Sequence, residues 1–174
     1  VADDHSLIRQ GMEFMIEELE FEGDVFHASS LQKVLETVET KPVDIVIIDA
    51  VFPDGNSLSI ISQIKQIKPE IKILVFSGLD EHTQSLKYIK AGANGFLSKL
   101  SEEDDIKNAI LKIHEQGKYL SAITQDLLLN SVAIKHTLHP SKILSEREFQ
   151  IAEMYAKGLG NLEISANLDL KQNT

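Results

Sequence analysis

The stretch Val43-Asp-Ile-Val-Ile-Ile-Asp49 decides the fold class, because it is a short, mostly β-branched apolar run that ends on a carboxylate. Such a near-continuous run is typical of a central parallel strand that is covered on both faces. The sequence therefore predicts a parallel sheet with Asp49 placed directly after one of its buried strands.

Working outward from this run, short strand-like segments alternate with longer amphipathic ones. Apolar residues at helical spacing predict the helices, and β-branched runs predict the strands. This alternation favours an α/β fold with a doubly wound five-stranded parallel sheet. The predicted strands are 1–2, 25–26, 43–48, 71–76 and 95–98, and the predicted helices are 7–19, 58–67, 83–91 and 102–115.

The pattern changes after Gly117, where the strand signals stop. A helix is predicted at 123–135, and Pro140 lies in a turn-like linker. Ser145-Glu-Arg-Glu148 is a capping-box sequence that predicts a helix to about Lys157, and a second short helix is expected at 161–168. We therefore expect a domain at 1–120, a linker with a helical start at 121–143, and a small all-α domain at 144–174.

Composition narrows the class of protein. The chain has 174 residues, no cysteine, and 17 Lys and Arg against 27 Asp and Glu, for a net charge of −10. The absence of cysteine excludes a disulfide framework, a thiolate metal site and a cysteine nucleophile. No apolar run has the length of a membrane span and no signal peptide opens the chain, so a soluble cytoplasmic protein is expected.

Polar side chains follow four of the predicted strands. They are Asp3 and Asp4 after the first, Asp49 after the third, Ser77 after the fourth and Lys99 after the fifth. The carboxyl ends of parallel strands meet at one edge of a sheet, where ligands bind. Three adjacent carboxylates suit Mg²⁺, and a lysine with a hydroxyl suits a phosphoryl group. We expect a carboxylate that accepts phosphate with the help of a metal.

Four motifs make residues 1–120 similar to the receiver domain of two-component response regulators. They are the opening Val-Ala-Asp-Asp-His, the run to Asp49 with Pro53-Asp-Gly55, Ala91-Gly-Ala-Asn-Gly95, and Phe96-Leu-Ser-Lys99. The resemblance implies a flavodoxin-like sheet with strand order 2-1-3-4-5.

The resemblance also implies a role for each residue of the edge. Asp49 would be the phosphoacceptor, and Lys99 would contact the phosphoryl oxygens. Mg²⁺ would be bound by Asp3, Asp4, Asp49 and the backbone carbonyl of Val51.

A conformational switch is implied as well. Ser77 would supply the switch hydroxyl and Phe96 the switch aromatic ring. Phosphate on Asp49 would draw Ser77 inward, and Phe96 would rotate into the space that Ser77 leaves. The surface formed by 83–91, 95–98 and 102–115 would then change shape.

The segments Leu144-Ser-Glu-Arg-Glu148 and Gly158-Leu-Gly-Asn-Leu-Glu-Ile164 resemble the LuxR-type helix-turn-helix domain. Together with the receiver motifs they indicate the NarL/FixJ family of transcriptional regulators. By the family pattern, the first strand would begin before Val1 and the recognition helix would follow Thr174. The resemblance implies a sensor histidine kinase, DNA and a second copy of the chain as partners, and no membrane.

The sequence departs from common receiver patterns at two positions. Leu100, not proline, follows Lys99, so a trans peptide bond is expected there. Phe96 has no hydroxyl where many receivers have tyrosine, so it cannot donate a hydrogen bond when it turns inward.

Alternative readings of the function stay open. The acidic charge also fits a phosphorylation-switched protein–protein interaction module that never binds DNA. A phosphotransferase or phosphohydrolase would usually carry a second aspartate two residues after the nucleophile, where this chain has Val51, so the protein is not expected to be an enzyme. Arg147, Lys157 and Lys171 could contact DNA phosphates or simply be solvated.

Two other groups of polar residues are predicted to have ordinary structural roles. His5 reads as the start of a helix, and the acidic run 102–105 reads as a first turn that the helix dipole favours.

Overall fold

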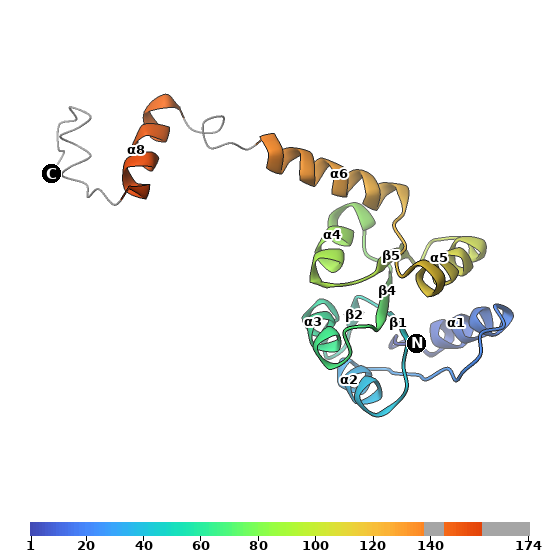
Figure 1. Ribbon diagram of the computed structural model, residues 1–174. Coiled ribbons are helices and arrows are strands. Elements are labelled where there is room, and N and C mark those ends of the chain that lie inside the picture. The colour runs from blue at the N-terminus through green and yellow to red at the C-terminus, as the bar shows by residue number, and fades with distance from the viewer. Residues whose placement is uncertain (138–144, 158–174) are drawn as a thin grey trace. The chain divides into compact units, whose positions relative to one another are not determined.

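The structure is a computed structural model that describes residues 1–137 and 145–157 (Figure 1). It divides into two units, Val1–Leu128 and Leu129–Thr174, each of which is considered by itself. The predicted domain boundaries at 120 and 143 stay a prediction.

Three parallel strands form the regular part of the sheet in the first unit. They are β1 (Ile45–Ile48), β4 (Lys72–Ser77) and β5 (Gly95–Ser98), in the order β1-β4-β5. Ala2 forms parallel bridges to both Ile48 and Ala28, so the segments around Ala28 and Ala2 continue the sheet beyond β1. The resulting order is the predicted 2-1-3-4-5.

The two outer segments pair through single bridges rather than through full strands. The strand predicted at 25–26 is wrong in position, because the bridge forms at Ala28. Backbone hydrogen bonds nevertheless tie this segment to the first one: Ala28 N donates to the carbonyl of Val1, and Asp3 N donates to the carbonyl of Ala28. This pairing places Asp3 at the same sheet edge as Asp49.

Helices cover both faces of the sheet. Helices α1 (Ser6–Glu18) and α5 (Glu103–Gln116) lie on one side, and α2 (Leu31–Thr40), α3 (Leu58–Ile67) and α4 (Glu81–Ala91) lie on the other (Figure 1). Strand residues alternate between two buried cores, as the period of a strand requires. Ile47, Leu74, Phe76 and Leu97 pack with α1 and α5, and Val46, Ile48, Ile73, Val75 and Phe96 pack in the other core.

Two local elements were not given bounds by the sequence. Helix α2 begins after Ser30, whose side chain accepts a hydrogen bond from Lys33 N. The strands β2 (Val51–Phe52) and β3 (Gly55–Asn56) form a short antiparallel hairpin after Asp49. Its Asp54 carboxylate accepts from Leu31 N at 2.9 Å, so the hairpin also caps α2.

The C-terminal helices agree with the sequence where they are described. Helix α6 spans Ala122–Thr137 and α8 spans Glu146–Ala156. The capping box at Ser145 is confirmed, because Ser145 N donates to Glu148 Oε2 at 2.8 Å and Glu148 N donates to Ser145 Oγ at 3.3 Å. The helix expected at 161–168 lies outside the described residues.

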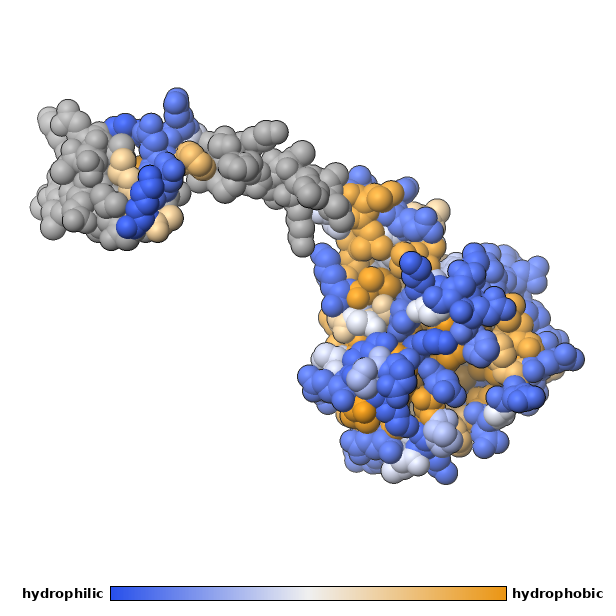
Figure 2. Space-filling view, viewed as in Figure 1, coloured by the Kyte–Doolittle hydropathy of each residue, from blue (hydrophilic) through white to orange (hydrophobic). Residues whose placement is uncertain are grey.

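The surface around the start of α6 differs from the rest of its unit. Figure 2 shows mostly hydrophilic residues over the first unit and apolar residues gathered over the first turns of α6; Leu129 of this helix, with which the second unit begins, is 68% exposed. Within the part of the chain that the structure describes, no helix is long and apolar enough to cross a membrane.

Candidate functional site

The four predicted strand ends meet at one edge of the sheet. Lys99 is the centre of the contact: its Nζ lies 2.5 Å from Asp3 Oδ2 and 2.7 Å from Asp49 Oδ2. Ser77 is brought to the same place, because its carbonyl accepts a hydrogen bond from Lys99 N at 2.9 Å. These residues come from four separate stretches of the chain, and the parallel sheet alone brings them together.

The site carries more negative than positive charge. Asp3 is 2% exposed and Asp49 is 7% exposed, so both carboxylates are largely removed from water. Lys99 is the ammonium that both of them contact, and Asp4 adds a third carboxylate beside Asp3. Buried carboxylates that share one cation repel each other and favour a further cation.

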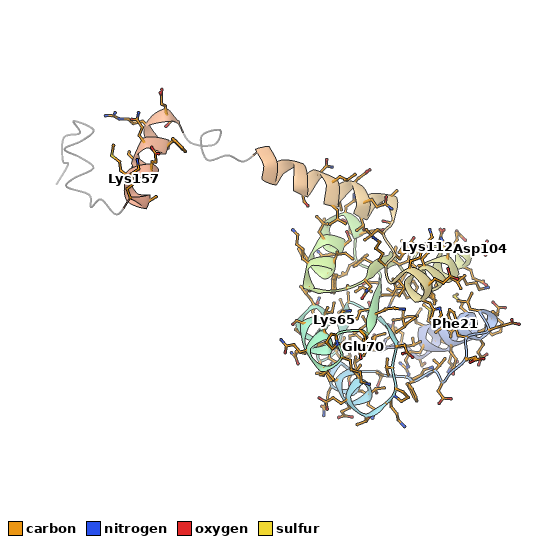
Figure 3. All side chains as sticks on the ribbon, in the orientation of Figure 1. Phe21, Lys65, Glu70, Asp104, Lys112 and Lys157 are labelled. Atoms are coloured by element: carbon orange, nitrogen blue, oxygen red, sulfur yellow. The ribbon has the colours of Figure 1, made fainter. Side chains whose placement is uncertain are left out.

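A comparison of Lys99 with Lys65, another partly buried lysine of this unit, shows what the carboxylates do to the lysine pKa. Burial alone lowers the pKa of Lys99, but the hydrogen bonds that its ammonium donates to the Asp3 and Asp49 carboxylates outweigh this effect, and the pKa is raised. Lys65, at the end of α3 near Glu70 (Figure 3), donates to the Asn94 side-chain oxygen and the Ile71 carbonyl, and burial lowers its pKa. The ammonium of Lys99 is therefore held charged by anions, which suits contact with a phosphoryl group.

A hollow of about 200 Å³ opens beside Asp49. It is lined by Asp49, Val51, Ser77, Gly78, Leu79 and Lys99. Since a water molecule occupies about 30 Å³ of liquid, the hollow has room for a phosphoryl group and several waters. The Ser77 hydroxyl accepts a hydrogen bond from Leu79 N at 3.2 Å, which leaves the hydroxyl proton available for an acceptor in the hollow.

The metal-binding residues that were predicted fit Mg²⁺ by their chemistry. Asp3 and Asp4 lie next to each other at the edge, and Asp49 joins them through Lys99. Val51 begins β2 two residues beyond Asp49 and is half-exposed, at the mouth of the hollow. Hard oxygen donors with excess negative charge are the set that Mg²⁺ prefers.

Sequence reasoning missed two neighbours of these aspartates. His5 was read as the start of a helix, and it is the N-cap residue of α1, but its Nδ1 also lies 3.1 Å from Asp3 Oδ1 and 2.9 Å from Asp4 Oδ1. Arg9 Nη1 donates to the carbonyls of Asp3, at 2.6 Å, and Asp4, at 3.2 Å. The only signal for Arg9 was its place early in α1, which folds back over the segment before it.

The predicted switch aromatic Phe96 is fully buried, and a tyrosine packs against it. The ring centroids of Tyr88 and Phe96 are 5.6 Å apart. The Tyr88 hydroxyl donates to Asn56 Oδ1 at 2.8 Å, and burial raises the pKa of Tyr88. Tyr88 on α4 thus makes a polar contact to Asn56 of β3 that Phe96, which has no hydroxyl, cannot make. The peptide bond before Leu100 is trans, as expected, since the described residues contain no cis bond.

Comparisons with known proteins agree with this arrangement. The family model described as "Response regulator receiver domain" matches residues 1–111, and "Bacterial regulatory proteins, luxR family" matches residues 142–174. Response regulator UvrY of Escherichia coli (strain K12) is 30% identical over 175 residues, covering 100% of this chain and 80% of the relative.

Comparison with solved structures shows that the fold is similar to that of response regulators. A two-component response regulator of the LuxR family from Aurantimonas sp. SI85-9A1 has a TM-score of 0.65 and 28% identity, covering 75% of this chain and 94% of that one. The isolated receiver domain of RcsB from Salmonella enterica serovar Typhimurium, solved with the phosphomimetic BeF3-, has a TM-score of 0.66 and 19% identity. The matched region covers 72% of this chain and 94% of the RcsB domain, and the likeness concerns the fold alone.

Proposed function

Because the chain belongs to the two-component response regulators, with a receiver domain and a LuxR-type DNA-binding domain, we propose that Asp49 is its phosphoacceptor. The observation that carries this proposal is the contact of Lys99 with both Asp49 and Asp3 beside the hollow that Ser77 also lines. Asp49 is the aspartate of that hollow, so it is the carboxylate that an incoming phosphoryl group meets.

In the proposed reaction a carboxylate oxygen of Asp49 attacks the phosphorus of a phosphohistidine on a sensor kinase. The new P–O bond forms as the P–N bond breaks, and the imidazole leaves with the electron pair. Asp3, Asp4, Asp49 and the carbonyl of Val51 would hold Mg²⁺, which supplies Lewis-acid stabilisation of the phosphoryl charge. The family consists of response regulators and transcription factors. The phosphoryl transfer that we propose would accordingly act on the chain's own Asp49 and on no external substrate.

Two residues of the hollow then change partners. Lys99 turns from Asp49 Oδ2 to the new phosphoryl oxygens, and the Ser77 hydroxyl donates its proton to another of them. Charge-assisted hydrogen bonds contribute about 1.5–3 kcal/mol each. Moving a two-state domain from 1:99 to 99:1 takes about 5.5 kcal/mol, so two or three such bonds are enough.

The output of this switch is DNA binding by the luxR-family part of the chain. Transcriptional regulators of this kind meet two half-sites as symmetric dimers, so we propose a homodimer as the DNA-binding species. A recognition helix of the luxR-family part would enter the major groove. Sensor kinase, DNA and regulator would meet in the cytoplasm.

The net charge of −10 favours one other function, a phosphorylation-switched module that binds a partner protein and not DNA. The two functions differ in the salt dependence of DNA affinity. A DNA-binding regulator neutralises phosphates, so the logarithm of its affinity falls linearly with the logarithm of salt concentration. A protein-binding module shows no such affinity with any DNA sequence.

The acceptor is tested by intact mass after incubation with Mg²⁺ and acetyl phosphate. Wild type and an Asp44→Asn control are expected to gain one phosphoryl group, whereas Asp49→Asn gains none. Asp44 is an exposed aspartate just before β1, at the opposite end of the strand that Asp49 follows. The control variant therefore loses the same charge next to the same strand, but away from the hollow. A phosphoryl group on Asp49→Asn, or none on wild type, contradicts the proposal.

A further inference from the structure

A second buried polar cluster, built around a single carboxylate, lies away from the hollow and has no part in the proposed phosphotransfer. Glu81, the first residue of α4, accepts hydrogen bonds from the hydroxyls of Ser121 and Thr124, the latter at 2.8 Å. Thr124 is fully buried, and Glu81 and Ser121 are partly buried. We call these three residues the α4–α6 joint.

The joint holds the point where α6 begins. The Ser121 hydroxyl oxygen accepts a hydrogen bond from Thr124 N at 3.1 Å, which caps the first turn of α6. The same hydroxyl donates its proton to Glu81, so the cap and the joint share one side chain. The Glu81 carboxylate therefore fixes both the position of Ser121 and the start of α6.

On the other side, the joint is linked to the hollow by a short piece of chain. Only Gly78, Leu79 and Asp80 separate Ser77 from Glu81. Leu79 N donates to the Ser77 hydroxyl, and the Leu79 side chain packs against the buried core, so this segment is held at both its start and its middle. A displacement of Ser77 must therefore be absorbed within three residues or passed on to Glu81.

We propose that Glu81 is a positioning residue that couples the Ser77–Asp80 segment to α6, the helix that leaves the receiver-like unit toward the luxR-family part. This coupling rests on the proposed function, since it needs Ser77 to move when Asp49 carries a phosphoryl group. When the Ser77 hydroxyl turns to a phosphoryl oxygen, the segment follows, Glu81 shifts, and its two hydrogen bonds lengthen. A bond of 2.8 Å is close to the optimum, so a shift of about 1 Å breaks it.

The expected result is a looser first turn of α6. Without the carboxylate, the Ser121 cap loses its partner and the buried Thr124 hydroxyl is left without an acceptor, which is unfavourable. Amide hydrogen exchange reports such local opening directly. The coupling thus predicts that phosphorylation of Asp49 speeds exchange at residues 122–128.

The test compares amide exchange at 122–128 in the full chain with and without Mg²⁺ plus beryllofluoride as the phosphoryl analogue. In wild type the analogue should speed exchange several-fold. In Glu81→Gln exchange should be about tenfold faster from the start and should not respond to the analogue. Glu103→Gln, which changes an exposed first-turn glutamate of α5, should behave as wild type.

Two further measurements keep the outcome decisive. Thr124→Val removes one of the joint's two hydroxyls, the buried one, from the α6 side and should give the same fast, unresponsive exchange, with α4 untouched. The intact mass of Glu81→Gln after acetyl phosphate should still show one phosphoryl group, because Glu81 lies outside the hollow.

The failures are distinguishable. No phosphoryl group on wild type overturns the proposed function, and the coupling with it. A phosphoryl group without any change at 122–128, or a Glu81→Gln protein whose α6 still responds, overturns the coupling alone.

Discussion

The hollow and the α4–α6 joint satisfy their carboxylates in opposite ways. Asp3 and Asp49 share one ammonium, on a long side chain that can swing to another anion. Glu81 is satisfied by two hydroxyls and by its place in the first turn of α4, where the helix dipole favours a negative charge. The Lys99 ammonium of the hollow can therefore exchange one anionic partner for another, whereas the hydrogen bonds of the α4–α6 joint can only form or break.

The largest expected effect comes from removing that ammonium. Lys99→Met leaves Asp3 and Asp49 side by side without their shared cation, and breaking such a pair costs about 3 kcal/mol. We expect a loss of this size in the free energy of unfolding, measured by urea denaturation at pH 7, together with loss of phosphorylation. Lys65→Met, whose ammonium contacts neutral oxygens, should cost clearly less. Equal losses in the two variants contradict the charge argument.

Magnesium addition should give the next largest effect. A cation that binds the native state alone stabilises it by about 2.7 kcal/mol at a hundredfold excess over Kd. Wild type and Asp44→Asn are expected to rise in Tm as Mg²⁺ is added, and chelation by EDTA should reverse the rise. Asp4→Asn should lose most of it. A Tm that is unaffected by Mg²⁺ in wild type would show that the three carboxylates bind no such cation.

Removal of the Tyr88 hydroxyl should have a smaller effect. Tyr88→Phe deletes the hydrogen bond to Asn56 Oδ1, whose net contribution is about 1 kcal/mol. Since burial raises the pKa of Tyr88 above its ordinary 10.0, the unfolded chain loses this proton first. Stability should therefore fall as pH rises through 10 and beyond. Urea titrations from pH 8 to 11 should show a shallower fall in Tyr88→Phe, and an identical slope would contradict this.

The same contrast explains what the sequence could predict. The edge residues were predictable because each lies at the end of a short strand-like segment, most clearly Asp49 after Ile45–Ile48, and the parallel sheet brings all strand ends together whatever the loops do. The strand at 25–26 was misplaced because pairing there depends on single bridges of Ala2 and Ala28, which leave no periodic pattern. Roles for Asp49, Lys99 and Ser77 came from the family resemblance and stay predictions until tested.

The joint and the Tyr88 contact could not be predicted for a different reason. Glu81 and Ser121 are 40 residues apart, and each reads by itself as an ordinary helix-end residue. Their meeting depends on how α4 and the start of α6 pack, which no local pattern encodes. Arg9 is similar, because its two backbone acceptors are visible only after α1 folds back on the first strand segment.

The smallest effect should come from the capping box of α8, which repeats the serine–carboxylate pair of the joint on an exposed surface. Hydrogen bonds from Ser145 lower the pKa of Glu148 below its ordinary 4.5, so the ionised carboxylate stabilises the start of α8. This contribution is present above pH 4.5 and is lost as pH falls through the lowered pKa. Glu148→Gln should speed amide exchange in 146–152 only two- to threefold, roughly, at pH 7.

Glu146→Gln is the matched control, since Glu146 lies in the same first turn. Water competes for Ser145 and Glu148 but hardly reaches Thr124, which is why the exposed pair should matter less than the buried one. If Glu148→Gln speeds exchange as much as Glu81→Gln does, burial is not what strengthens the joint, and the difference between the two carboxylate–hydroxyl pairs would have to come from the helices they join.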